Sequence, residues 1–358
     1  MPPFSPGDRL IVLGAGATRA ARFIETFEPV CAPPLNTDFF TQLQRITQPK
    51  YAKLVREVIE DVVGLFGPNF TLTLEDYFTQ LEFLAEAARI APPTSGSVSS
   101  ARLRKARDRL MQAVSGVLEM STDAAIRRSK GCELHQRLVQ NVDAKDTFIS
   151  FNYDCVLDHA LRQHGDCRWS ARYGYAFPRP SRVEGTDAWD PVRPARTSAE
   201  TIYLLKLHGS LNWQLPVPSG DREKDRRHRD PIRLKQRLHA QRGVPRFTVI
   251  PPVWNKAVRE DPVFEVLWRN AERAIRSASH IAIVGFSFAP TDLPVESLFR
   301  VALAGRSARL KTLVIANKSP AHRQRTRAVF ARALEGSAIV RQYDDVTEFV
   351  DAFPDCLN

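Results

Sequence analysis

Short apolar runs that alternate with amphipathic stretches are the feature of this 358-residue chain that most constrains its fold. A continuous apolar run predicts a strand buried on both faces, and such strands, when helices separate them, form parallel sheets covered on both sides. The runs are Arg9–Leu13, Thr147–Phe151, Ile202–Leu207, Phe247–Ile250, Ile281–Val284, Thr312–Ala316 and Ala338–Val340. The sequence therefore predicts an α/β protein with a Rossmann-like, doubly wound parallel sheet.

Two segments interrupt this alternation. Residues from about 41 to 143 carry apolar residues mostly at i, i+3 and i+4, which predicts a helical insertion. Residues from about 215 to 246 are densely charged with few apolar anchors, which predicts a mobile loop or an exposed helix. We expect both segments to belong to one domain that spans residues 1–358.

Composition limits the class of protein and its partners. The formal net charge of +11 suits an anionic ligand, a nucleic acid or an acidic partner, and charge alone does not choose among them. No apolar run approaches the roughly 20 residues of a membrane helix, and the N-terminus lacks the regions of a signal peptide. We therefore expect a cytoplasmic protein that does not enter a membrane.

The five cysteines give no sign of a metal site. They are scattered, and no two form a C-x-x-C pair; they are Cys31, Cys132, Cys155, Cys167 and Cys356. A disulfide framework or a four-thiolate zinc site needs paired spacing. We expect single buried thiols and no bound metal.

The first two predicted strands, Arg9–Leu13 and Thr147–Phe151, are each followed by a motif that could bind a ligand. The glycines of Gly14–Thr18 would let the backbone approach a pyrophosphate, although the usual third glycine is missing and a tight turn without a ligand is the alternative. In Ser150–Asp154, Asp154 is a candidate helix N-cap. Asn152 has no such explanation, and its amide could hold both a water and a ribose hydroxyl because it offers an acceptor and donors.

Three further motifs follow later strands. His208 ends a buried strand and precedes glycine, which favours a position facing a cleft, where it could take a proton near neutral pH; a single histidine is otherwise usually structural. Gly285–Ser287 and Asn317 follow the next two strands, and either could be only a turn. All five motifs nevertheless fall at carboxyl ends of predicted strands, the edge where open α/β sheets bind ligands.

The order of these motifs resembles the sirtuin superfamily. GAGAT, SFNYD, LHGS, VGFS and VIANKS follow one another as do the family's GAG-x-S loop, T-Q-N-I-D segment, catalytic H-G, late G-x-S and strand ending in I-N. Thr18 replaces the family serine and keeps the hydroxyl. Asp38-Phe39 resembles the acidic-aromatic pair of the P-D-F-R loop, with Phe40 in place of the arginine.

The differences from the sirtuin motifs indicate which branch of the superfamily the chain resembles. The two C-x-x-C pairs of the deacylase zinc module are absent after His208, and helices lengthen the chain before Asn152. With PPLNTDFF, LEDYF and FNYDCVLDHAL, the chain resembles the zinc-free sirtuin-like NAD hydrolases of prokaryotic antiphage defence. The resemblance implies an NAD+ glycohydrolase that cleaves the nicotinamide–ribose bond and depletes NAD.

The resemblance also assigns roles to residues. Asn152 would orient water at the anomeric carbon, and His208 would act as the base. The glycine loop with Thr18 would hold phosphate, Asp154 the nicotinamide amide, and Ser287 with Asn317 the adenosine end. The complete set of implied NAD contacts is Gly14, Ala15, Gly16, Thr18, Asp38, Phe39, Asp154, Gly285, Ser287 and Asn317.

Other functions remain open at this point. A non-catalytic NAD or ADP-ribose sensor, or an assembly subunit of a defence complex, fits the same motifs. Protein deacylation is disfavoured because the zinc module is missing, and direct nucleic-acid binding has only the charge in its favour.

A hydrolase that drains NAD needs restraint, which could come from oligomerisation, from the insertion or from a partner. The resemblance suggests a DNA-translocating ATPase or an Argonaute-like protein as the partner. Apolar residues of the insertion either pack inside or form a homo-oligomer interface; they are Leu81, Phe83, Leu84 and Ile90. The basic segment Arg222–Arg242 could cover the cleft or bind an acidic partner.

Overall fold

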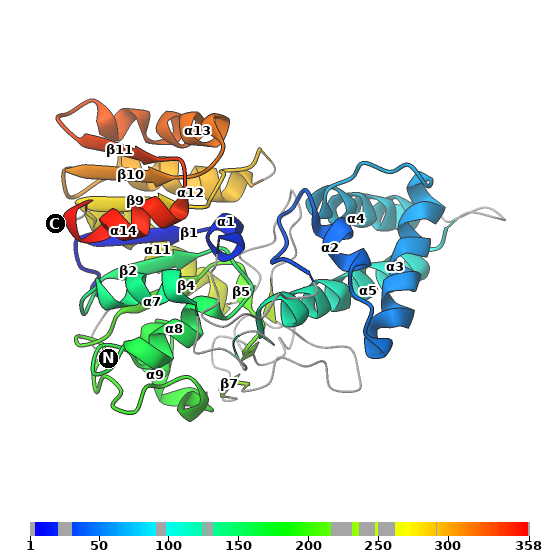
Figure 1. The fold of residues 1–358 in the computed structure, drawn as a ribbon, viewed down its shortest axis with the longest axis horizontal. Helices are drawn as coiled ribbons and strands as arrows, with labels where there is room; N and C mark the ends of the chain where they lie inside the picture. The colour runs from blue at the N-terminus through cyan, green and yellow to red at the C-terminus, as the bar shows by residue number, and fades with distance from the viewer. Residues whose placement is uncertain are drawn as a thin grey trace.

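A six-stranded, all-parallel sheet forms the centre of the computed structural model (Figure 1). The model describes residues 4–20, 31–90, 98–123, 126, 132–215, 231–235, 248–249, 262–290 and 292–356. In spatial order, the strands are β11 (Ile339–Tyr343), β10 (Thr312–Ala316), β9 (His280–Val284), β1 (Arg9–Leu13), β2 (Thr147–Ser150) and β4 (Tyr203–Lys206). The predicted α/β class with a parallel sheet is confirmed.

The sheet is wound in two directions from its centre. The chain runs outward from β1 to β2 and β4, returns to β9 on the other side of β1, and continues to β10 and β11. Because parallel crossovers are right-handed, the helices that connect successive strands lie on opposite faces in the two halves. One face carries α7 (Glu133–Gln140), α8 (Val156–His164) and α14 (Val346–Cys356), and the other α11 (Pro262–Ser277), α12 (Leu293–Ala304) and α13 (Pro320–Phe330) (Figure 1). The direction reverses between β1 and β9.

The predicted strand Phe247–Ile250 does not extend this sheet within the described residues. Its described part, β8 (Thr248–Val249), pairs antiparallel with β5 (Gly209–Ser210) in a separate two-stranded sheet. A turn at Leu207 and His208 separates β4 from β5, and Gly209, the first residue of β5, has a φ of +83°. The chain has therefore left the plane of the parallel sheet before it reaches β8, and the prediction was wrong on this point.

The charged segment also contains a strand. β7 (Ile232–Leu234) pairs with β3 (Val183–Glu184) and β6 (Trp213–Gln214). Ile232 and Leu234 are buried while Arg233 is exposed, the two-residue alternation of a strand with one covered face. The prediction of a mobile loop or an exposed helix was therefore wrong for residues 231–235. Residues 216–230 and 236–246, with most of the basic segment, lie outside the described residues.

The helical insertion lies beside the sheet (Figure 1). It contains α2 (Phe39–Gln44), α3 (Pro49–Phe66), α4 (Leu74–Ile90) and α5 (Ser100–Leu118), followed by a π-helical turn (Glu119–Asp123). Both α3 and α4 pack on α5, whereas α7 packs on α8 and α14 against the sheet. Leu81 is buried, which supports internal packing, the first of the two alternatives for this residue. Phe83, Leu84 and Ile90 are exposed, with 61%, 37% and 71% of their surface accessible.

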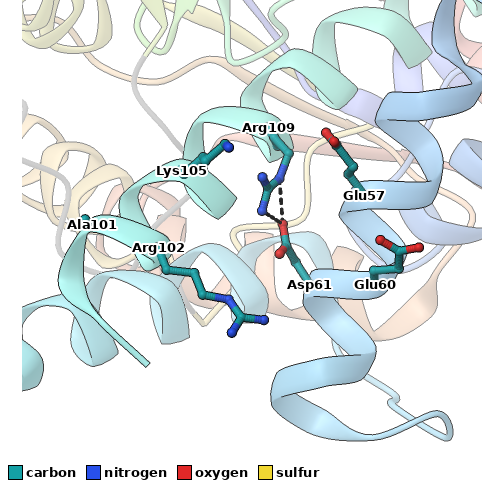
Figure 2. Close-up of a pocket in the computed structure, with 7 residues that line it drawn as sticks. All are labelled: Glu57, Glu60, Asp61, Ala101, Arg102, Lys105 and Arg109. Carbon is teal, nitrogen blue, oxygen red and sulfur yellow. Dashed lines mark hydrogen bonds and ion pairs between the residues drawn. The ribbon is translucent and has the colours of Figure 1, made fainter. Parts of the chain in front are cut away.

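A charged groove of about 470 Å³ lies between α3 and α5 (Figure 2). Its α3 wall carries Glu57, Glu60 and Asp61, and its α5 wall carries Arg102, Lys105 and Arg109. Asp61 and Arg109 form an ion pair with 10% and 14% of their side chains exposed, which ties the two helices together. Every residue that lines the groove belongs to the insertion, and none belongs to a motif at the edge of the sheet.

The helices of the described ranges include none whose length and apolar character suit a membrane crossing.

The buried His135 predicts a loss of stability in acid. Burial lowers the pKa of this α7 residue to about 4, whereas an unfolded histidine titrates near 6.5. The unfolded chain therefore binds more protons as the pH falls from 6.5 to 4, and the free energy of unfolding decreases across that window. We expect His135→Leu to lose about 2 kcal/mol less than the wild type between pH 7 and pH 4.5.

Urea denaturation at the two pH values measures this difference. His322→Gln, on the exposed surface of α13, is the matched control and should change the pH dependence much less. An equal loss of stability in His135→Leu and the wild type would contradict the prediction.

Candidate functional site

The five motifs identified in the sequence follow five strands that are adjacent in the sheet. In the order β10, β9, β1, β2 and β4, the strands are followed by Asn317, Gly285, Gly14, Asn152 and His208. The carboxyl ends of parallel strands share one edge, so the motifs line that edge, next to the helical insertion (Figure 1). Its centre is the point between β1 and β9 where the winding reverses, which is where sheets of this type bind ligands.

Three glycines bring two loops into backbone contact at this point. The N–H of Gly14 donates to the Val284 carbonyl at 3.0 Å, and the N–H of Gly16 donates to the Gly285 carbonyl at 2.9 Å. A Cβ atom at Gly14 or Gly16 would lie 2.6 or 2.8 Å from the Gly285 carbonyl oxygen. These glycines are thus required by packing between the loops, whether or not a phosphate also approaches them. Ala15, which follows Gly14, is exposed at this edge.

A chain of hydrogen bonds joins the first motif to the second. The Nδ2 of Asn152 donates to the Gly14 carbonyl at 3.0 Å and to the Thr18 Oγ1 at 3.0 Å. Thr18 in turn donates to the Asp154 Oδ2 at 2.9 Å. All three side chains are buried. Both of these Asn152 hydrogen bonds use Nδ2, and Oδ1 is the acceptor end of the same amide.

Asp154 also supports the start of α8. Its Oδ1 accepts from the Val156 N–H at 3.0 Å, but Cys155 occupies the N-cap position, so the expected cap at Asp154 is one residue too early. Burial raises the pKa of Asp154, and the ammonium group of Lys206 acts in the opposite direction. The carboxylate therefore has defined internal partners on both of its oxygens.

His208 lies in an aromatic and acidic environment. Its ring centroid is 5.0 Å from that of Phe151, which stacks on Phe286 at 4.4 Å. Its Nε2 lies 3.9 Å from the Oδ1 of Asp292. A carboxylate beside an imidazole can orient the ring. The second, third and fourth motifs therefore meet around His208.

Asp292 was not among the residues selected from the sequence. It stands at the N-cap of α12, a common place for aspartate, yet its side chain makes no capping hydrogen bond. It is buried, with 6% of its surface exposed, near His208. An acidic residue before Leu293 and Pro294 indicates the start of a helix. The sequence around Asp292 therefore predicts a helix N-cap and does not indicate a position near His208.

A second unexpected carboxylate comes from the insertion. Glu75, in the first turn of α4, is buried, and Asn36 contacts both its backbone N–H (2.8 Å) and its Oε2 (3.4 Å). Burial raises the pKa of Tyr153, and the charges of Glu75 and Asp292 raise it further. Glu75 and Asp292, which are far apart in the sequence, therefore both act on Tyr153 of the second motif.

The acidic-aromatic pair has a structural setting. The Asp38 carboxylate accepts from the Arg19 guanidinium at 2.7 Å and from the Leu35 N–H at 2.8 Å. Arg19 ends α1 (Ala15–Arg19), so this ion pair joins the glycine loop to the start of the insertion. Phe39 is fully buried. Phe40, at the position of the family arginine, packs edge-on against Phe39 and two other aromatic rings.

The remaining predicted residues lie on the other side of the switch point. Asn317 donates through Nδ2 to the Phe286 carbonyl at 3.1 Å and accepts through Oδ1 from the Ser319 N–H at 3.0 Å. Both ends of its amide are thus engaged in shaping the turn. Ser287 is half-buried and stands between Phe286 and Phe288 in the sequence.

Comparison with known proteins does not place the chain in a family. No family model matches it, and no curated protein is significantly similar to it. Among the described residues, no group of three or more His, Cys, Asp or Glu side chains is arranged to hold a metal ion. The resemblance to sirtuin-like proteins therefore rests on the motifs themselves.

Proposed function

We propose that this protein hydrolyses NAD at the nicotinamide–ribose bond and releases nicotinamide and ADP-ribose. The observation that carries the proposal is the hydrogen-bonded set of Gly14, Thr18, Asn152 and Asp154 at the switch point of a doubly wound sheet. These are the residues to which the sirtuin resemblance assigns phosphate binding, water placement and nicotinamide binding. His208 lies on the neighbouring strand end.

The chemistry asks little of the protein beyond placement. The bond between the anomeric carbon and the nicotinamide nitrogen breaks, and its electron pair leaves with the neutral nicotinamide. Water adds to the cationic ribose and loses a proton. The Oδ1 of Asn152 would accept a hydrogen bond from that water, and His208, oriented by Asp292 at 3.9 Å, would take the proton. NAD is a substrate in this scheme, and no zinc takes part.

A non-catalytic sensor of NAD or ADP-ribose is the second candidate. The observation in its favour is that Asn152 and Asp154 already have internal hydrogen-bond partners, which are typical of residues that shape a site. Incubation of the purified chain with NAD separates the two functions. Hydrolysis predicts loss of NAD with equal amounts of nicotinamide and ADP-ribose, whereas a sensor binds NAD and leaves its concentration unchanged.

The cellular role follows from the same resemblance. We propose that the protein acts in the cytoplasm to deplete NAD during antiphage defence, held inactive by self-association or by a partner such as a DNA-translocating ATPase or an Argonaute-like protein. The net charge of +11 is compatible with an acidic partner or with nucleic acid.

Self-association predicts a change of mass in surface variants. Phe83 and Ile90 lie seven residues apart on α4, hence on one side of the helix, and both are largely exposed. If this apolar side is a subunit interface, Phe83→Ser/Ile90→Ser should convert a homo-oligomer into a monomer in multi-angle light scattering. Val192→Ser, which changes an apolar residue that is 98% exposed, is the control. A monomeric wild type at micromolar concentration, with and without NAD, would contradict the prediction.

A further inference from the structure

A buried lysine lies directly beneath the candidate site. Lys206 is the last residue of β4, and Asp158 lies on α8; the side chain of each is only 1% exposed. The ammonium Nζ is 3.0 Å from the Asp158 Oδ2 and also donates to the backbone carbonyl of Asp154. The lysine therefore joins the second motif to the strand that leads into His208.

The network around this lysine continues to Tyr175 and Asn212. The Tyr175 hydroxyl donates to the Oδ1 of Asp158 and accepts from the Nδ2 of Asn212 at 3.1 Å. Tyr175 and Asn212 are fully buried. Asp158 thus holds Lys206 through one oxygen and Tyr175 through the other, so the ammonium group has a fixed position.

Stability alone does not require such a pair. Moving a charged group out of water costs several kcal/mol, and apolar residues of similar volume are often as stabilising as a buried ion pair. What an apolar pair could not do is donate to the Asp154 carbonyl. Two backbone hydrogen bonds also join the second motif to the chain around His208. The N–H of Leu207 donates to the Ser150 carbonyl, and the N–H of Leu211 donates to the Tyr153 carbonyl.

We propose that Lys206 is a positioning residue of the candidate site, whose ammonium group fixes the segment from Asn152 to Asp154 against the segment that carries His208. The proposal rests on the NAD-hydrolase function for its effect on turnover. It concerns geometry that exists without NAD, so it is also testable in the absence of substrate.

The charge of Lys206 acts on Asp154 as well. Burial lowers the pKa of Lys206, but Asp158, Cys155 and Asp154 together raise it above its ordinary value, so the lysine is charged at neutral pH. That charge lowers the pKa of Asp154, while burial and the nearby Asp158 raise it. Lys206 is the largest of the influences that lower the pKa of Asp154, so its removal should raise that pKa further.

The test uses the double variant Lys206→Met/Asp158→Asn, which removes both charges and so leaves no unpaired charge in the core. We expect it to fold and to lose about 10²-fold in kcat for NAD, the effect typical of a misplacement of about 1 Å, with a smaller change in KM. Lys206→Gln is the second variant and keeps a hydrogen-bond donor without the charge. Its kcat should lie between those of the wild type and the double variant.

A measurement without substrate completes the test. The ¹³C carboxyl resonance of Asp154, assigned with Asp154→Asn, should titrate at a higher pH in both variants than in the wild type. If the wild type cleaves NAD and either folded variant keeps its full kcat, the proposal is overturned. If the wild type does not cleave NAD, the hydrolase function fails, and the titration alone decides: an unchanged pKa of Asp154 overturns the positioning role.

Discussion

Asn152→Ala and His208→Ala are each expected to lower the rate of NAD cleavage by roughly 10²–10⁴-fold, the usual effect of losing a positioned catalytic group. The Asn152→Ala variant would lack the amide oxygen that is proposed to accept a hydrogen bond from the attacking water. The His208→Ala variant would lack the proposed base, the imidazole whose Nε2 lies 3.9 Å from the Oδ1 of Asp292. The measurement is the initial rate of nicotinamide release from NAD by the purified protein.

Matched controls separate chemistry from folding. His280→Ala changes a histidine at the amino end of β9, on the opposite edge of the sheet from the site. Asn141→Ala changes an asparagine at the end of α7 that donates to the Arg137 carbonyl at the surface. Both controls should keep the wild-type rate. Full activity in Asn152→Ala and His208→Ala, with melting temperatures showing folded protein, would remove the catalytic assignment.

Gly285→Ala is expected to be the most destabilising small substitution in the site. Gly285 has a φ of +61°, and a Cβ there would lie 2.2 Å from the Ala17 nitrogen, which is backbone and cannot rotate away. Strain in the left-handed region and the clash together should lower the free energy of unfolding by at least about 3 kcal/mol. Urea denaturation measures this change.

Gly64→Ala provides the control for the same chemical change. Gly64 lies in α3 with no atom within 4 Å of an added Cβ. Alanine there should raise the free energy of unfolding by about 0.5–1 kcal/mol, because glycine is a poor residue inside a helix. Similar effects at the two positions would show that the contact between the two loops is not as close as described.

The sheet could be predicted from the sequence because a buried parallel strand is a continuous apolar run, which can be recognised locally. Five of the six strands are mostly buried apolar runs such as Thr312–Ala316, and each matching prediction was within two residues of the observed ends. The edge strand Ile339–Tyr343 has no buried residue, and the matching prediction, Ala338–Val340, stopped three residues short of its end. The alternation of Ile232 and Leu234 with Arg233 was hidden by the many charges around it. A three-residue strand is too short for periodicity to outweigh such a background.

The site was predictable where strand ends define it and unpredictable where tertiary contacts do. Position after a strand was enough to select Asn152 and His208. Nothing local distinguishes Asp292 from an ordinary N-cap, or Glu75 from any acidic residue in a first helical turn. Lys206 stands within an apolar run, where its burial was implied but its bond to the Asp154 carbonyl was not.

The pairing of β1 has a consequence for biosynthesis. Leu10 pairs with Thr147 on one side and with Ile281 on the other, so the two partners of the central strand follow it by 137 and 271 residues in the sequence. Contacts so distant in sequence form slowly, because a long loop must close first. The loop from Gly285, which completes the switch point, is made later still. A nascent or prematurely terminated chain that ends before Gly285 therefore lacks the assembled switch point.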